Sequence, residues 1–238
     1  MKAEFIDKMG TDLTVVNAAR VSFDKESEWE LVPECCGHGT INGCCLEPYP
    51  SEQLAEKDQK LIKYLANHNH WTPFSHVMIQ MRETVPIFVA RQRFKHMVGF
   101  TYNEVSRRYV DDEPKFFLPN EWRKAPANSK QGSDGPLPYH QLEYTDGLKD
   151  HHEMCTNYYR WLIDEGVAPE QARMVLPQSM YTSYYVTGSL AAWARAYKLR
   201  IDPHAQKEIQ DLATQWGEII GATPELKYSW EALTNKKE

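Results

Sequence analysis

The segment 85–109 (VPIFVARQRFKHMVGFTYNEVSRRY) constrains this chain more than any other, because it must fold with many charges among apolar side chains. It opens with Pro86 and a short apolar run, which is typical of a core helix. Phosphates and polar rings are bound by guanidinium, amide, carboxylate and hydroxyl groups, so the segment predicts a ligand site. The polar residues concerned are Arg91, Gln92, Arg93, Lys95, His96, Asn103, Glu104, Ser106, Arg107 and Arg108.

A solvated helix face is the alternative interpretation, since arginine stems often cover apolar surface. If Pro86 starts a helix, Arg91 and Lys95 share one face at i and i+4, and Gln92 and His96 share the adjacent one. Like charges at that spacing repel unless an anion or a carboxylate lies between them. A bound phosphate or Glu104 would meet this need.

The segment resembles the signature region of flavin-dependent thymidylate synthases, the class that methylates dUMP without a cysteine nucleophile. The matching strings are PIFVARQ (86–92) and YNEVSRRY (102–109). The family has an Arg-His-Arg triplet where this chain has Lys95, His96 and Met97, so one cation near the flavin is replaced. An alignment of the triplet with residues 91–93 is the alternative, but it shifts the PIFVARQ match.

Further blocks extend the resemblance over most of the chain: 15–24 (VVNAARVSFD), 69–76 (NHWTPFSH), 172–177 (ARMVLP) and 181–209. The resemblance implies an α+β fold, a single domain over 1–238 with a central, mainly antiparallel sheet and long helices. The matching blocks are missing mainly from two stretches, 25–58 and 111–150. We expect a Cys-rich insertion at about 33–50 and a Pro/Gly/Ser loop at about 123–138.

The resemblance also implies which residues bind dUMP. A bidentate guanidinium suits a phosphate or the uracil edge and would stabilise negative charge as C5 becomes nucleophilic. Arg200 and Ser106 are the candidates for catalytic roles, Ser106 through binding, because a hydroxyl without an adjacent base is a weak nucleophile. The expected dUMP ligands are Gln92, Arg93, Lys95, Glu104, Ser106, Arg107, Arg108, Arg173 and Arg200.

The implied flavin contacts depart from the family pattern near the C-terminus. Where the family often has Asn-x-Arg, this chain has Ser189, Leu190 and Ala191, and Arg195 is the candidate replacement for the cation. His204 has a structural alternative, because with Asp202 it could cap a helix starting near residue 203. The expected FAD ligands are His70, Thr72, Ser75, Lys95, His96, Met97, Glu104, Ser189, Arg195 and His204.

The implied chemistry needs a cofactor and two co-substrates. FAD is reduced by NADPH, methylenetetrahydrofolate donates a methylene group to C5 of dUMP, and flavin hydride completes the methyl group. The family assembles as a homotetramer with shared active sites. A catalytically impaired nucleotide- and flavin-binding protein of the same fold is the alternative, because Met97 and the missing Asn-x-Arg remove family residues.

The cysteines raise a separate question. Two Cys pairs with a histidine between them could supply thiolate and imidazole to zinc, but vicinal cysteines chelate one ion poorly. We therefore expect no metal and a Gly-rich surface insertion with free thiols, and we expect Cys155 to fill the core. The residues of this insertion are Cys35, Cys36, His38, Cys44 and Cys45.

Charge and hydropathy exclude some classes of protein. The net charge of -6 argues against nucleic-acid binding, and the lack of eighteen consecutive apolar residues argues against a membrane span. The polar N-terminus does not resemble a signal peptide, so we expect a soluble cytoplasmic protein. Periodicity predicts a strand at 77–81, a short helix at 169–173 and longer helices at 58–68, 139–165 and 203–220, with Gly166 closing the second of these.

Overall fold

The computed structural model describes residues 1–34, 49–110, 112–127 and 131–235. Most of the Cys-rich insertion lies outside these residues, and the question of zinc at Cys35, Cys36, His38, Cys44 and Cys45 lies outside them too. Within the described part of the chain, no group of His, Cys, Asp and Glu side chains is placed to hold a metal ion. In the same part, no helix has the length and apolarity needed to cross a membrane.

The chain forms two compact units, each built from several segments. The first comprises Met1–Asp7, Ile79–Gly188 and Arg195–Ile219, and the second comprises Lys8–Met78, Ser189–Ala194 and Ile220–Glu238. Helices combined with an antiparallel sheet confirm the expected α+β class. The limits predicted for one domain over 1–238 stay a prediction.

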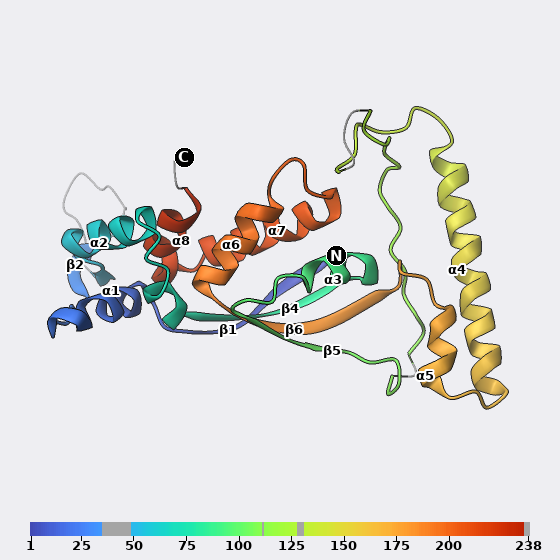
Figure 1. Ribbon diagram of the computed structural model, residues 1–238, viewed down its shortest axis with the longest axis horizontal. Coiled ribbons are helices and arrows are strands. Elements are labelled where there is room, and N and C mark those ends of the chain that lie inside the picture. Colours follow the sequence, from blue (N-terminus) through green and yellow to red (C-terminus); the bar gives the residue numbers. More distant parts are fainter. Residues whose placement is uncertain (35–48, 111, 128–130, 236–238) are drawn as a thin grey trace, which may run out of the picture. The chain divides into compact units, whose positions relative to one another are not determined.

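A four-stranded sheet is the centre of the first unit (Figure 1). Its strands, in sheet order, are β1 (Lys2–Met9), β4 (Met78–Pro86), β6 (Tyr181–Ser189) and β5 (Phe100–Glu104). Strand β5 pairs antiparallel with β6, from Phe100 opposite Gly188 to Glu104 opposite Tyr184. A Cβ atom at Gly188 would lie 2.3 Å from the Phe100 ring, so this close pairing requires glycine.

Strands β4 and β6 bury alternate side chains, as a sheet packed on a core does. The predicted strand at 77–81 is confirmed, but β4 continues to Pro86. The strand is longer than predicted because Glu83 occupies one of its buried, inward-facing positions. A charged residue at such a position interrupts the apolar alternation from which the strand was predicted.

The helices that lie wholly or mainly in the first unit largely follow the periodicity. The predicted helix 139–165 is confirmed as α4, and Gly166 closes it with a φ of +83°. The predicted short helix corresponds to α5 and a following 3₁₀ turn, η3. The elements are α3 (Ile87–Arg93), α4 (Gln141–Asp164), α5 (Pro169–Ala172), η3 (Arg173–Val175), α6 (Leu190–Arg200) and α7 (Lys207–Gly221).

Two details of the helix prediction are wrong. Helix α3 ends at Arg93, and the backbone N–H groups of Lys95 and His96 bond to the carbonyls of Gln92 and Arg93 in tight turns. Arg91 and Lys95 therefore do not share a helical face. The helix predicted at 203–220 begins only at Lys207, because the preceding residues form a separate turn.

The second unit packs its helices beside a two-stranded sheet (Figure 1). Here α2 confirms the helix predicted at 58–68. Asp12 is fully buried and accepts the backbone N–H groups of Tyr228 and Ser229, each at 2.9 Å, so it joins α1 to the start of α8. The elements are α1 (Asp12–Arg20), η1 (Val21–Phe23), β2 (Glu30–Glu34), β3 (Tyr49–Gln53), α2 (Glu56–Asn67), η2 (Pro73–His76), η4 (Pro224–Leu226) and α8 (Lys227–Thr234).

Two further expectations concern the first unit. The predicted loop at 123–138 has, in its described residues, no helix or strand beyond an isolated bridge between Arg123 and Pro136. Cys155 was expected in the core but is only half-buried on α4, with its Sγ 3.6 Å from Nε2 of His151. Cys155 is less buried than expected because most residues of α4 are exposed or half-buried.

Candidate functional site

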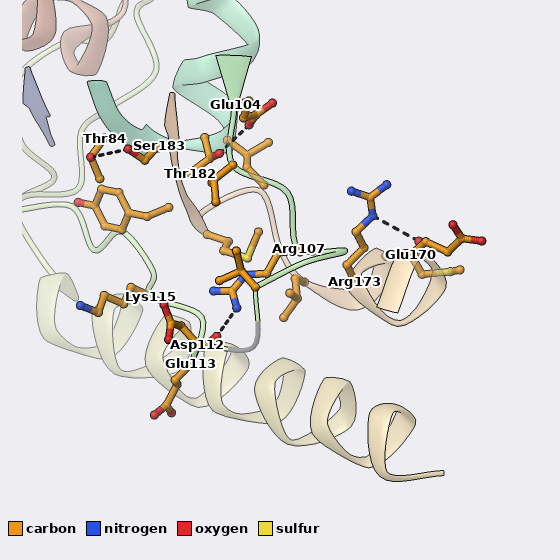
Figure 2. A pocket seen from close by; sticks show the side chains of 17 residues that line it. Thr84, Glu104, Arg107, Asp112, Glu113, Lys115, Glu170, Arg173, Thr182 and Ser183 are labelled. Carbon is orange, nitrogen blue, oxygen red and sulfur yellow. Dashed lines mark hydrogen bonds between the residues drawn. The ribbon is translucent and has the colours of Figure 1, made fainter. Parts of the chain in front are cut away.

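A pocket of about 640 Å³ lies in the first unit and collects three of the residues predicted to bind dUMP. Glu104 ends β5, Arg107 follows on the next segment, and Arg173 begins η3 (Figure 2). The start of β6 adds Thr182 and Ser183 to the lining, and Asp112, Glu113 and Glu170 add carboxylates to it. We call this the Arg107 pocket.

Each of the three residues is held by a hydrogen bond. The Thr182 hydroxyl donates to Glu104 Oε1 at 2.6 Å, and Arg173 Nε donates to the Glu170 carbonyl at 3.3 Å. Arg107 Nη1 donates to the carbonyl of Asp112. A guanidinium has five N–H donors, so both arginines are oriented by the protein and retain donors for an anion in the pocket.

Ser106 and Arg108 adjoin this pocket in the sequence but are not among the residues that line it. Ser106 Oγ accepts a hydrogen bond from Arg108 Nε at 3.2 Å, and the Arg108 guanidinium lies 4.9 Å from the centre of the Tyr109 ring. The side chain that hydrogen-bonds to the Ser106 hydroxyl is thus the cation Arg108, which cannot act as a base. This fits a binding role for Ser106 better than a nucleophilic one.

A second pocket of about 470 Å³ in the same unit contains Gln92, Arg200 and His204. We call it the Arg200 pocket. Arg200 is half-buried, and its Nε donates to Nε2 of His96 at 2.8 Å. The buried Oε1 atom of Gln92 has no hydrogen-bond partner among the described residues. The pocket therefore offers a guanidinium and an amide oxygen to a polar ligand.

His96 is a neutral imidazole in this arrangement. Its pKa is lowered from the ordinary 6.5 to about 4, first by burial and then by the charges of Arg200, Arg93 and Arg195. Because arginine can only donate, Nε2 of His96 accepts and the ring proton is on Nδ1. His96 was predicted to contact FAD, and the structure shows it as a partner of Arg200.

Titration of His96 predicts a pH dependence of stability. Between about pH 4 and 6.5 the unfolded chain binds a proton on this residue that the folded chain does not, so the contribution of His96 to stability should rise with pH across this window. The contribution is fully present above 6.5 and is lost as the pH falls toward 4. Burial raises the pKa of Asp12 to about 6, so Asp12 contributes an opposite slope in both proteins. Urea unfolding at a series of pH values should therefore show a more positive slope of stability against pH in the wild type than in His96→Asn. Equal pH profiles would contradict the prediction.

Arg93 has a different place from the one predicted for a dUMP ligand. Its side chain is fully buried, its Nε lies 3.2 Å from Glu83 Oε2, and it lines neither pocket. Burial of both partners makes this a structural ion pair.

The residues predicted to contact FAD are distributed over both units. His70 and Thr72 are exposed in the second unit, where Ser75 donates to the Trp71 carbonyl at 3.4 Å. Ser189 is buried and its Oγ accepts the backbone N–H of Ala192 at 3.2 Å, so its hydroxyl is used inside the protein.

The exposed segment 95–99 fits a flavin better than Ser189 does. Met97 and Val98 are each 73% exposed, Lys95 is exposed beside them, and Arg195 donates to the Val98 carbonyl. Two cations beside apolar side chains have the chemistry that a phosphate and a flat ring require, and Lys95, Met97 and Arg195 are among the predicted FAD ligands.

His204 follows the structural alternative in part. Asp202 Oδ1 accepts the backbone N–H of His204 at 2.7 Å, but the bond closes a turn and does not cap α7, which begins at Lys207. The side chain of His204 lines the Arg200 pocket.

Several residues of the Arg107 pocket were missed by the sequence reasoning. Thr182 and Ser183 lie within the matching block 181–209, and their hydroxyls at the start of a strand were the available signal. Lys115 and Glu113 fall where the resemblance has no matching block, so no comparable signal existed.

The first unit of this α+β fold therefore contains two pockets in which arginine side chains lie beside carboxylates and neutral polar groups. Residues 4–224 match the family described as "Thymidylate synthase complementing protein". The flavin-dependent thymidylate synthase of Thermosipho africanus is 36% identical over 219 residues, 90% of this chain and 83% of that protein. The Thermus thermophilus enzyme of the same name is 35% identical over 215 residues, 90% of this chain and 69% of that protein.

Solved structures agree with these relatives. The UMP/dUMP methylase PolB from Streptomyces cacaoi, bound with 5-Br dUMP, superposes with a TM-score of 0.77 and is 27% identical, covering 98% of this chain and 94% of that chain. The chain belongs to the flavin-dependent thymidylate synthase family.

Proposed function

We propose that this protein catalyses the reductive methylation of dUMP to dTMP. The observation that carries the proposal is the Arg107 pocket, which Glu104, Arg107 and Arg173 line from three separate segments in a member of this family. Two oriented guanidiniums suit the dianionic phosphate of a nucleotide, and strand hydroxyls suit its sugar or base.

Arg200 supplies a different interaction. Its guanidinium is anchored through Nε by the neutral imidazole of His96, which orients its remaining donors. A guanidinium placed against the O2/N3 edge of uracil would stabilise the negative charge that develops when C5 acts as a nucleophile. Arg200 is therefore the residue that we assign to the chemistry, and Ser106 and Arg108 to binding.

The flavin family implies the cofactor, and the co-substrates complete the proposal. FAD supplies a hydride when reduced, NADPH is the reductant, and methylenetetrahydrofolate is the carbon donor. Lys95, Met97 and Arg195 are the residues of the described chain that fit the flavin. We propose a homotetramer with shared sites as the assembly; a cytoplasmic location stays an expectation from the sequence.

An anaerobic assay tests the function. Purified protein with dUMP, methylenetetrahydrofolate, NADPH and FAD should form dTMP, detected by chromatography, and omission of any one component should stop the reaction. Protein that binds FAD and dUMP but forms no dTMP would instead support the impaired binding protein, which the exposed Met97 in place of a family cation favours.

A cysteine-free variant separates this chemistry from the thiolate mechanism of ordinary thymidylate synthases. With all five cysteines replaced by Ser or Ala, the enzyme should still form dTMP, because no thiol is expected to attack C6 of dUMP. Loss of the half-buried Cys155 should cost about 1 kcal/mol or less of stability. A stable 5-fluoro-dUMP adduct mapped to any cysteine by mass spectrometry would overturn the mechanism.

A further inference from the structure

Arg93 and Glu83 form a buried ion pair that also contacts Tyr184 and two aromatic rings. Both side chains are fully buried, Arg93 Nε lies 3.3 and 3.2 Å from the two Glu83 oxygens, and the Tyr184 hydroxyl donates to Glu83 Oε2 at 2.5 Å. The guanidinium also lies 4.5 Å from the Phe100 ring centre and 4.6 Å from that of Trp216. Such a pair holds its members in fixed positions, because burial penalises every arrangement that separates them.

The buried guanidinium of Arg93 also fixes the position of the Tyr102 hydroxyl. Arg93 Nη1 donates to the Tyr102 hydroxyl at 2.6 Å, and the same hydroxyl lies 2.6 Å from the His96 carbonyl. Arginine has no acceptor, so the hydroxyl must accept from Arg93. Its single proton has two carbonyl acceptors, and that of His96 at 2.6 Å is much closer than that of Arg93 at 3.4 Å, so the main hydrogen bond goes to His96.

His96 connects this chain of bonds to the Arg200 pocket. Its backbone is held by the Tyr102 hydroxyl, and its ring, 8% exposed, accepts from Arg200 Nε at 2.8 Å. A shift of the His96 backbone would move the only ring atom that can accept from Arg200, since Nδ1 carries the proton. The orientation of Arg200 thus depends on the Tyr102 hydroxyl.

We propose that Arg93 is a positioning residue, which acts through the Tyr102 hydroxyl to fix His96 and so orients Arg200 toward the nucleotide. The proposal rests on the function proposed above. It gives Arg93 a role without substrate contact, in agreement with its burial and its absence from both pocket walls.

The chain offers a matched pair of variants. Tyr102→Phe and Tyr184→Phe each remove one hydroxyl from the same buried cluster and keep the ring, but only Tyr102 contacts His96. In FAD-loaded enzyme, Tyr102→Phe should raise the Kd for dUMP about threefold to tenfold, the effect of one lost hydrogen bond. Tyr184→Phe should leave the Kd within about twofold.

A spectroscopic measurement makes the test independent of dUMP. In ¹⁵N-histidine-labelled enzyme, assigned with His96→Asn, the wild type and Tyr184→Phe should show His96 protonated on Nδ1. Tyr102→Phe should show mixed tautomers and a raised His96 pKa. The double variant Glu83→Gln/Arg93→Met, which removes the donor to Tyr102 without leaving a buried charge, should behave like Tyr102→Phe.

Two results would overturn the proposal: a wild-type His96 spectrum in Tyr102→Phe, or equal changes in both tyrosine variants. Wild-type protein that binds no dUMP would refute the proposed function, and the histidine spectra would still decide on the positioning of His96.

Discussion

Glu83→Gln should lower the free energy of unfolding by about 3–5 kcal/mol, because it leaves the Arg93 guanidinium buried without a counter-charge. Glutamine has nearly the shape of glutamate, so the loss would come from charge and hydrogen bonding and not from a cavity. Both oxygens of Glu83 lie within 3.3 Å of Arg93 Nε, and the Tyr184 hydroxyl lies 2.5 Å from one of them. Urea denaturation at pH 7 measures the difference.

Two controls make this result specific. Glu56→Gln disrupts an exposed pair with Lys60, in which both side chains are more than 70% accessible, and should cost less than about 0.5 kcal/mol. The double variant Glu83→Gln/Arg93→Met removes both charges and should recover much of the stability lost in Glu83→Gln. A loss below about 1 kcal/mol in Glu83→Gln would show that the charge of Arg93 is compensated in another way.

The same carboxylate shows which parts of the fold the sequence could predict. Helices α2 and α4 follow from local periodicity and from Gly166 as a stop signal, so their prediction needed no tertiary information. The far half of β4 did not follow, because its inward position 83 carries a charge that is tolerated only beside Arg93. The buried position of Glu83 therefore depends on a contact between β4 and α3, which a local sequence pattern does not show.

The polar segment 85–109 was correctly identified as unusual, but its arginines could not be told apart by composition. Arg93 is buried against β4, Arg107 lines a pocket, and Arg108 lies over Tyr109. Which guanidinium faces a ligand depends on strand direction and on where α3 ends. Arg173 reaches the Arg107 pocket from a distant part of the chain, and only the family resemblance indicated that it belongs to the site.

Arg200→Ala and Arg108→Ala should each weaken dUMP binding about ten- to a hundredfold, or about 1.5–3 kcal/mol, since each removes a charge-assisted contact. Arg200 lines its pocket and is anchored by His96, whereas Arg108 lies beside the Arg107 pocket with Ser106 as its partner. The two variants therefore test separate clusters of the candidate site. Calorimetry on FAD-loaded protein gives the affinities.

The contribution of the planar geometry of the Arg200 guanidinium can be tested separately from that of its charge. Arg200→Lys keeps the charge but loses the planar pair of donors, so it should recover only part of the affinity lost in Arg200→Ala. Lys149→Ala removes an exposed cation paired with Asp146 on α4 and should leave dUMP binding unchanged. Unchanged affinity in both arginine variants would remove Arg200 and Arg108 from the site. Loss of dUMP affinity in Arg200→Ala alone would show that, of these two arginines, only Arg200 contributes to dUMP binding.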